Sequence, residues 1–246
     1  MKVKDQAHQF ALYIKNLEQI KQKKNIDEKD LIHRIINILR LEVNNELILF
    51  DENKNILIKL KNINKKNIEF DILKEEKNKK FRTKIISVLP ILKRNHFEEA
   101  LYNLVEIGVD EIQLVNTTKS ANEFFKIDRI KSIIVSAAEQ SKNFSSSHLK
   151  NAISLDTFLS EIKKLSFPKI FFDPSGENIL DVIEREKKFQ KTKEIILFVG
   201  PEGDLTQDEK DQLNSAGFIF CKLTPTILRA SSAITLGSGI FRSIFE

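Results

Sequence analysis

Three proline-containing segments in the last third of the chain hold the residues best suited to chemistry. Each follows an apolar, β-rich run: residues 173–176 (Asp-Pro-Ser-Gly), 200–204 (Gly-Pro-Glu-Gly-Asp) and 224–229 (Thr-Pro-Thr-Ile-Leu-Arg). Ligands of parallel sheets bind beyond the carboxyl ends of the strands, so we expect these segments to line a ligand site. The two glycines of the second segment let its backbone turn tightly and leave amides and carbonyls open to a ligand. An ordinary strand-to-helix turn is the alternative for that segment.

The chain has none of the usual fingerprints of nucleotide, metal or hydrolase sites. No Gly-x-Gly-x-x-Gly follows a strand pattern, no segment ends as a P-loop does in Gly-Lys-Ser/Thr, and no Gly-x-Ser-x-Gly is present. The four histidines are scattered, and none forms a spaced pair with a cysteine or another histidine, so no metal site is expected. The single cysteine, Cys221, lies in an apolar strand pattern and is expected in the core.

Hydrophobic periodicity indicates which elements position the three segments. From residue 84 onward, strand patterns alternate with helical patterns, which predicts an α/β fold with a parallel sheet covered by helices on both faces. Thr206 and Glu209 form a Thr-x-x-Glu capping box, and Gly108 ends a helix. The expected strands are 84–89, 111–115, 169–172, 195–199 and 218–223, and the expected helices are 97–107, 128–142, 155–164, 178–188, 207–216 and 232–245.

The N-terminal part of the chain has a different pattern, with short strands around one helix. A helix is expected at 30–40 and strands at 46–51, 55–60 and 67–72, which together predict a small β-barrel over residues 1–72. Residues 74–80 are polar and have no apolar period. We therefore expect a linker at 73–80 and a second domain at 81–246.

Composition places the chain among ordinary globular proteins. Hydrophobic residues make up 41% and charged residues 30% of the 246 residues, which argues against disorder. Apolar runs such as 194–199 are too short to cross a bilayer, so no membrane association is expected. The start of the sequence has no apolar h-region, and one cysteine cannot form an intramolecular disulfide. We expect a cytoplasmic protein.

The positive charge of the chain is concentrated in one stretch. Residues 54–84 contain eleven Lys or Arg against four Asp or Glu, a local excess larger than the net charge of +5 of the whole chain. Such a stretch suits a phosphate backbone, because neutralised phosphates release counterions. The alternative is a genome base composition that favours Lys, Asn and Ile, without a role in nucleic-acid binding.

Several motifs together resemble one family of RNA-modifying enzymes. Residues 198–206, followed by 216–218, Leu223 and 227–229, resemble the C-terminal signature of the ribosomal RNA small subunit methyltransferase E family, which belongs to the SPOUT methyltransferases. Residues 33–41 resemble the N-terminal His-x-x-x-Val-Leu-Arg element of that family. Further elements follow in the order of the family, so that the resemblance covers nearly the whole chain: Lys93, 106–110, Ser120, Arg129 and 138–141.

The resemblance implies both a fold and an activity. Members of the family form N3-methyluridine in 16S rRNA of the small ribosomal subunit with S-adenosyl-L-methionine as the cofactor. Their fold is a C-terminal SPOUT parallel sheet with a trefoil knot, preceded by a PUA-like β-barrel that helps to hold RNA, and the active unit is a homodimer. In the family, three loops hold the cofactor in the knot, and they correspond here to the three proline-containing segments.

The resemblance also assigns roles to residues of the site. Arg229 would stabilise the negative charge that develops on the uracil as N3 attacks the methyl group. Glu202 is the second candidate at the catalytic site, with a structural or orienting role favoured over that of a general base; a salt bridge between Arg229 and Glu202 that braces the knot is the alternative for Arg229. Cofactor contacts are expected from Asp173, Gly200, Pro201, Gly203, Leu223 and Leu228, and plain core packing is the alternative for Leu228.

RNA contacts are expected mainly from basic residues of the barrel. The alternative for Arg40 is an ion pair with an acidic residue across the domain interface. Three roles stay open for Lys93, Glu139 and Gln140: contact with RNA, contact with the cofactor, or packing against a second protomer. The candidates for RNA binding are Arg34, Arg40, Lys59, Lys61, Lys65, Lys66 and Lys93.

The sequence departs from the family pattern at three places. Thr224 stands where the family usually has glycine, residues 229–233 (Arg-Ala-Ser-Ser-Ala) lack a glutamate of the family's Arg-Thr-Glu-Thr-Ala, and residues 143–147 lack arginines. Fewer arginines weaken phosphate contacts. Two alternatives to the uridine-N3 methyltransferase therefore stay open: a SPOUT enzyme that acts on another RNA, and an RNA-binding protein without catalysis.

Overall fold

The computed structural model describes residues 9–145, 147–186, 189 and 192–246, and the chain divides into two units. The first unit comprises the chain up to Lys80 together with Ala138–Ser145, and the second comprises Phe81–Ala137 together with the chain after residue 145. The last residues of helix α4 (Ile127–Ser141) thus belong to the first unit. We describe each unit by itself.

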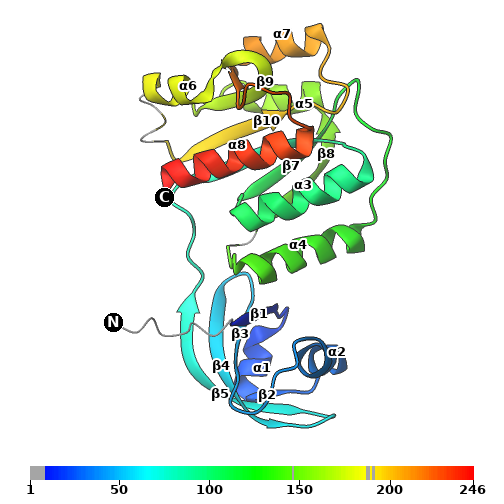
Figure 1. Cartoon of the computed structure of the whole chain (residues 1–246), viewed down its shortest axis with the longest axis vertical. Helices are drawn as coiled ribbons and strands as arrows, with labels where there is room; N and C mark the ends of the chain where they lie inside the picture. The colour runs from blue at the N-terminus through cyan, green and yellow to red at the C-terminus, as the bar shows by residue number, and fades with distance from the viewer. Residues whose placement is uncertain (1–8, 146, 187–188, 190–191) are drawn as a thin grey trace. The chain divides into compact units, whose positions relative to one another are not determined.

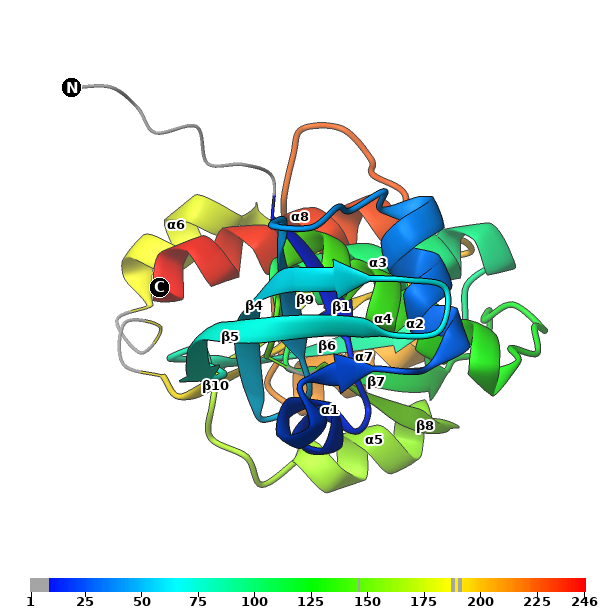
Figure 2. The same ribbon diagram turned by 90° about the horizontal axis from the view of Figure 1, so that it is seen from below.

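The first unit is built on a five-stranded sheet in the order β1-β3-β4-β5-β2. Strand β1 pairs with β3 in parallel, and the other neighbours are antiparallel. The long strands β4 and β5 run side by side and form a curved hairpin (Figure 2). The elements are β1 (Phe10–Tyr13), α1 (Leu17–Lys23), β2 (Asn25–Ile26), α2 (Lys29–His33), the π-helix η1 (Arg34–Ile38), β3 (Glu46–Phe50), β4 (Lys54–Ile63) and β5 (Ile68–Lys77).

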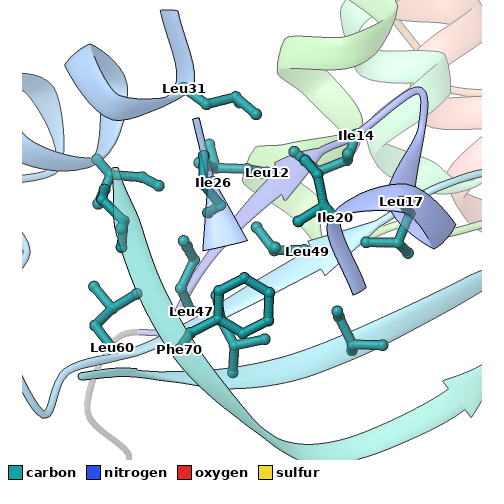
Figure 3. Close-up of a cluster of buried hydrophobic side chains, with 14 of the residues drawn as sticks. Leu12, Ile14, Leu17, Ile20, Ile26, Leu31, Leu47, Leu49, Leu60 and Phe70 are labelled. Carbon is teal, nitrogen blue, oxygen red and sulfur yellow. The ribbon is translucent and has the colours of Figure 1, made fainter. Parts of the chain in front are cut away.

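The core of this unit follows from the alternation of side chains along the strands. Successive side chains of a strand point to opposite faces, and in β4 the alternating residues Ile56, Ile58 and Leu60 are buried. Aliphatic residues of β1, β3 and the two short helices complete the cluster, together with Phe70 of β5 (Figure 3). One face of the sheet therefore packs on α1 and α2, and polar residues of β4 lie on the other.

Two sequence expectations for the first unit and its boundary are corrected. Residues 73–77, expected in a linker, continue strand β5, and Lys77 pairs with Lys54 of β4. These strand residues are mostly exposed, so the pairing leaves no hydrophobic period in the sequence. Residues 138–145, expected in the second domain, belong to the first unit, where the Phe144 ring packs 4.7 Å from the Phe50 ring.

The second unit is a six-stranded sheet, and all of its strand pairs are parallel. The strand order is β11-β9-β10-β6-β7-β8, so the α/β prediction is confirmed (Figure 1). Besides α4, the elements are β6 (Lys84–Pro90), α3 (Arg94–Ile107), β7 (Glu111–Asn116), β8 (His148–Ser154), α5 (Leu155–Ile162), β9 (Lys169–Asn178), α6 (Ile179–Arg185), β10 (Glu194–Val199), α7 (Gln207–Ser215), β11 (Ile219–Lys222) and α8 (Ala230–Phe245).

Helices cover both faces of this sheet, as the burial along β6 shows. Ile86 and Val88 belong to a buried cluster that includes residues of α5 and α7. Ser87, which lies between them and points to the other face, meets Ser238 of α8 with 3.2 Å between the hydroxyl oxygens. Helices α5 and α7 therefore lie on one face and α8 on the other.

The pairing of β9 with β11 is interrupted, and this interruption corrects another expectation. Phe171 pairs with Phe220, but the next residue of β11, Cys221, pairs with Glu177. Residues 172–176 thus lack a partner in β11 although they lie inside β9, instead of following the end of a strand at residue 172. Gly176 returns so close to β11 that a Cβ atom there would lie 2.5 Å from backbone atoms of Phe220. The helix expected at 178–188 is α6, which ends at Arg185, and residues 187–188 lie outside the described residues.

Candidate active site

A cavity of about 480 Å³ lies in the second unit, beyond the carboxyl ends of β10 and β11 and against residues 172–174 of β9. All three proline-containing segments line it, the first from within β9 and the others after β10 and β11. The lining residues are Phe172, Asp173, Pro174, Val199, Gly200, Pro201, Glu202, Asp204, Cys221, Leu223, Thr224, Thr226, Ile227, Leu228, Arg229, Ala230 and Ala233. The cavity thus joins residues that are up to 61 positions apart in the sequence.

The structure places most of the expected cofactor-binding residues at this cavity. Asp173, Gly200, Pro201, Leu223 and Leu228 line it, as do Arg229 and Glu202. Gly203 is not part of the lining. It packs against the Lys119 side chain, with 3.3 Å between a Cβ built on Gly203 and the nearest Lys119 carbon.

Glu202 turns toward helix α3 rather than toward Arg229. Its Oε1 accepts a hydrogen bond of 3.1 Å from the Lys93 amide and lies 3.0 Å from Nδ1 of His96. Burial alone would raise the pKa of Glu202, but the hydrogen bonds from His96 and from backbone amides outweigh burial and lower it. Lys93, which the sequence analysis predicted as an RNA contact, therefore contacts the segment at 200–204 through its backbone amide. The contact of His96 with Glu202 was not predicted.

The Arg229 side chain has a different environment. Arg229 is an exposed residue that precedes α8, and its carbonyl accepts the Ala233 amide at 2.8 Å. Among the described residues its guanidinium makes no ion pair or hydrogen bond. The alternative of an Arg229–Glu202 salt bridge is therefore wrong, and the guanidinium is available to a ligand at the edge of the cavity.

Lys210 of α7 connects two of the segments that line the cavity. Its Nζ lies 2.7 Å from Oδ2 of Asp173 and 2.7 Å from Oδ2 of Asp204. Burial alone would raise the pKa of Asp173, but the ion pair with Lys210 and the hydrogen bonds from Ser175 prevail and lower it. The sequence analysis missed Lys210, because nothing in the local pattern links a lysine in a helix to an aspartate 37 residues earlier.

The loop after β7 supports the segment at 200–206 from a second side. The capping box of α7 is confirmed, with Thr206 and Glu209 each bonded to the backbone of the other. Oε1 of Glu209 also accepts the Thr118 amide at 2.7 Å, and Nζ of Lys119 donates to the Gly203 carbonyl at 3.0 Å. Thr118 and Lys119 were missed by sequence reasoning, since only the fold brings this loop to α7.

The first unit shows which of its arginines are free. Arg34 forms an ion pair of 2.6 Å with Oε2 of Glu139, whose Oε1 accepts the Tyr13 amide at 2.9 Å. Arg40 is exposed, with a positive φ of 52°, and within the described residues of its own unit it makes no ion pair.

The candidate lysines differ in a similar way. Lys59 is half-buried, and Lys61 pairs with Asp71 at 3.0 Å. Lys65 and Lys66 are exposed in the turn between β4 and β5, and within the part of the chain that the structure describes neither makes an ion pair. Among the candidate lysines, the two turn lysines are therefore the ones most available to a phosphate.

Residues 9–145, 147–186, 189 and 192–246 contain no group of three or more His, Cys, Asp or Glu side chains placed to hold a metal ion. They also contain no helix with the length and hydropathy needed to span a bilayer.

A parallel α/β sheet with a cavity at the ends of its strands is typical of ligand-binding α/β proteins, and comparison with known proteins identifies the family. The RNA methyltransferase domain family matches residues 79–241, which is more than half of the chain. The protein therefore belongs to the RNA methyltransferase family, which confirms the resemblance found in the sequence.

Individual relatives agree with this assignment. The chain is 25% identical to ribosomal RNA small subunit methyltransferase E 2 of Borreliella burgdorferi over 90% of this chain and 91% of that protein. It is 24% identical to ribosomal RNA small subunit methyltransferase E of Rickettsia conorii, over 86% of this chain and 81% of that protein.

Solved structures share the fold over nearly the whole chain. The ribosomal RNA small subunit methyltransferase E from Neisseria gonorrhoeae, bound to S-adenosyl methionine, has a TM-score of 0.78 at 25% identity and covers 97% of this chain and 98% of its own. A methyltransferase from Legionella pneumophila in complex with the same cofactor has a TM-score of 0.77 at 20% identity, covers 96% of this chain and 98% of its own, and shows the fold.

Proposed function

We propose that this protein transfers the methyl group of S-adenosyl-L-methionine to N3 of a specific uridine in the 16S rRNA of the small ribosomal subunit, in the cytoplasm. The observation that carries the proposal is the cavity that joins three segments at the edge of a parallel sheet, with the unpaired guanidinium of Arg229 beside it. The names of the relatives, which are ribosomal RNA methyltransferases, support the substrate class.

The residues present at the cavity fit S-adenosyl-L-methionine. Its volume of about 480 Å³ is in the range of cofactor sites. Leu223 and Leu228 offer apolar surface to an adenine ring, and Gly200 and Pro201 offer backbone groups. Asp173 and Asp204 carry negative charge toward a ligand whose sulfonium is positive. When bound, the cofactor supplies an electrophilic methyl group.

The protein must then orient the uracil and stabilise charge on it. N3 of uracil carries a weakly acidic proton, so attack through N3 places negative charge on O2 and O4. The Arg229 guanidinium can donate hydrogen bonds to either oxygen without first breaking an ion pair. Glu202, held by His96 and by the Lys93 amide, fixes the segment at 200–204 and acts as a positioning group rather than as a general base.

Gly203 has an indirect role in this proposal. It does not line the cavity, and its carbonyl accepts a hydrogen bond from Lys119. We assign Gly203 to the support of the segment at 200–204 instead of direct contact with the cofactor.

We also propose the finer architecture that the family implies. The second unit would be a SPOUT domain with a trefoil knot, the first a PUA-like barrel that binds RNA, and the active form a homodimer. The close approach of Gly176 to the backbone of β11 supports a crossing of chain segments near the cavity. The five-stranded sheet with its exposed turn lysines supports an RNA-binding role of the first unit.

Two measurements test the proposal. Calorimetry of the purified protein with S-adenosyl-L-methionine should show one saturable site, and reverse transcription of 16S rRNA should show a stop at one uridine that disappears in a deletion strain. Failure to bind the cofactor would leave an RNA-binding protein without catalysis. Cofactor binding with methyl transfer to a different RNA would retain the enzyme class and overturn the 16S target.

A further inference from the structure

Three charged side chains from distant parts of the second unit meet at the rim of the cavity. Asp173 lies in the part of β9 (residues 172–176) that does not pair with β11. Asp204 ends the segment at 200–204, and Lys210 lies near the start of α7. Asp173 is buried, with 3% of the residue exposed, and the Lys210 side chain is 20% exposed. The two aspartates line the cavity, whereas Lys210 does not.

In each aspartate, Oδ1 bonds within its own segment and Oδ2 faces Lys210. Oδ1 of Asp173 accepts hydrogen bonds from the amide and the hydroxyl of Ser175, at 2.8 and 2.6 Å. Oδ1 of Asp204 accepts the Leu205 amide at 2.7 Å. One oxygen of each carboxylate thus fixes the turn of its own segment. The other oxygen of Asp204 accepts a hydrogen bond from Lys210, whereas the other oxygen of Asp173 forms an ion pair with the ammonium at 2.7 Å without a hydrogen bond.

Lys210 is therefore the link between the two segments. Without its charge, two carboxylates, one of them buried, would lie within reach of each other, and like charges in a poorly solvated place repel. Separation of the segments would relieve that repulsion, and it would change the cavity that they line. Two aspartates and one lysine also leave one net negative charge at the rim, which matches a cationic ligand.

We propose that Lys210 is a positioning residue that holds the segments at 172–176 and 200–204 together and so sets the affinity for S-adenosyl-L-methionine without contact with it. The proposal rests on the function proposed above. It assigns a role in cofactor binding to a residue outside the cavity wall, exerted through Asp173 and Asp204.

The test compares Lys210→Met with Lys210→Arg, which keeps the charge. Lys131→Met is the matched control, because Lys131 is an exposed lysine of helix α4 without an ion pair among the described residues. We expect Lys210→Met to raise the Kd and the KM for S-adenosyl-L-methionine by about tenfold or more, with kcat at saturating cofactor within about threefold of wild type. Lys210→Arg should recover most of the affinity, and Lys131→Met should change neither constant. An unchanged KM, or a fall in kcat alone, would overturn the proposal.

A second variant and a second readout keep the test decisive if Lys210→Met does not fold. Asp204→Asn keeps the Lys210–Asp173 pair, weakens the tie between the segments and removes one negative charge from the rim, so a rise in KM smaller than that of Lys210→Met is expected. Amide hydrogen exchange of residues 200–206 in the cofactor-free protein should be faster in both variants than in wild type. Unchanged exchange would refute the positioning role. Faster exchange in a protein that binds no cofactor would refute only the proposed function.

Discussion

Oε1 of Glu202 lies 3.0 Å from Nδ1 of His96, in the first turn of α3. The same oxygen accepts the Lys93 amide, so the carboxylate anchors the segment at 200–204 to the start of a helix. This contact fixes one segment of the cavity lining, and Arg229, which also lines the cavity, makes no ion pair among the described residues. The relationship assigns different duties to the two residues that the sequence analysis had placed together at the catalytic site.

The Glu202–His96 contact should stabilise the second unit measurably. The two side chains are 26% and 29% exposed, so solvent weakens the interaction, and we expect Glu202→Gln and His96→Ala each to lower the free energy of unfolding by about 1 kcal/mol. The double variant should lose less than the sum, with a coupling of about 0.5–1 kcal/mol. Urea denaturation measures these values. Glu99→Gln, at an exposed position of the same helix, serves as the control, and full additivity of the two variants would show that the contact contributes nothing.

Arg229 should matter for methyl transfer rather than for cofactor binding. We expect Arg229→Ala to lower kcat by about 10²–10³-fold, as the loss of a charge-stabilising donor does. Affinity for S-adenosyl-L-methionine should stay within about tenfold, or about 1.4 kcal/mol. Calorimetry and a methyl-transfer assay measure the two quantities, and Arg229→Lys, which keeps the charge, should retain part of the activity. A larger loss of affinity would make Arg229 a binding residue.

Hydrophobic periodicity predicted the strands and helices of the second unit that have one clearly buried face. It did not predict strands whose residues are mostly exposed, because such strands show no hydrophobic period. Strand β8 was missed because its residues are mostly exposed or half-buried at the edge of the sheet. The end of β5 was taken as a linker for the same reason. Two irregular features of the backbone were also not predicted: the interrupted pairing with β11 at residues 172–176 and the positive φ of Arg40. They depend on strand pairing and backbone angles that no local pattern encodes.

The candidate site was predictable only in part. Proline and glycine mark the three segments, and parallel topology gathers them at one edge of the sheet, so their convergence could be foreseen. His96, Lys119 and Lys210 could not, because each contacts a segment far away in the sequence. Positions of this kind follow from tertiary structure, and a single sequence without relatives contains no signal for them.

Two glycines of α8 should respond in opposite ways to alanine. A Cβ at Gly237 would lie 2.2 Å from the ring of Phe172, which lines the cavity, whereas a Cβ at Gly239 would have its nearest neighbour at 4.0 Å. Gly239→Ala should stabilise the protein by up to about 1 kcal/mol through helix propensity. Gly237→Ala should destabilise it by about 1–3 kcal/mol through overpacking and should weaken cofactor binding. Urea denaturation tests both, and equal effects of the two variants would contradict the packing at Phe172.

Asp173 should make stability depend on pH in the acid range. Its pKa in the folded protein is below the ordinary value of 3.8, so the charged carboxylate contributes stability above that value. The contribution is lost as pH falls through the folded pKa. The difference in unfolding free energy between wild type and Asp173→Asn should therefore be constant from about pH 5 to 7 and shrink below about pH 4. Urea denaturation at several pH values measures this difference, and a difference that does not change with pH would show that the carboxylate is not specially stabilised.

The last prediction separates RNA contacts from structural ion pairs in the first unit. Lys65 and Lys66 are exposed in a turn, so Lys65→Ala with Lys66→Ala should leave stability within about 0.5 kcal/mol of wild type. If both lysines contact phosphates, the slope of log affinity for RNA against log salt should fall by about 1.4, because each contact with a single strand contributes about 0.7.

Arg34→Ala should behave in the opposite way. Its partner Glu139 has a side chain only 12% exposed and also accepts the Tyr13 amide, so loss of the arginine leaves a poorly solvated carboxylate without its cation. Because Arg34 itself is 34% exposed, we expect a loss of about 1–2 kcal/mol of stability, less than for a fully buried pair, with the salt slope unchanged. Salt titrations of RNA binding, together with urea denaturation, decide between the two roles. A reduced salt slope at full stability would make Arg34 an RNA contact after all, since a residue that only holds Glu139 cannot change the number of phosphates neutralised.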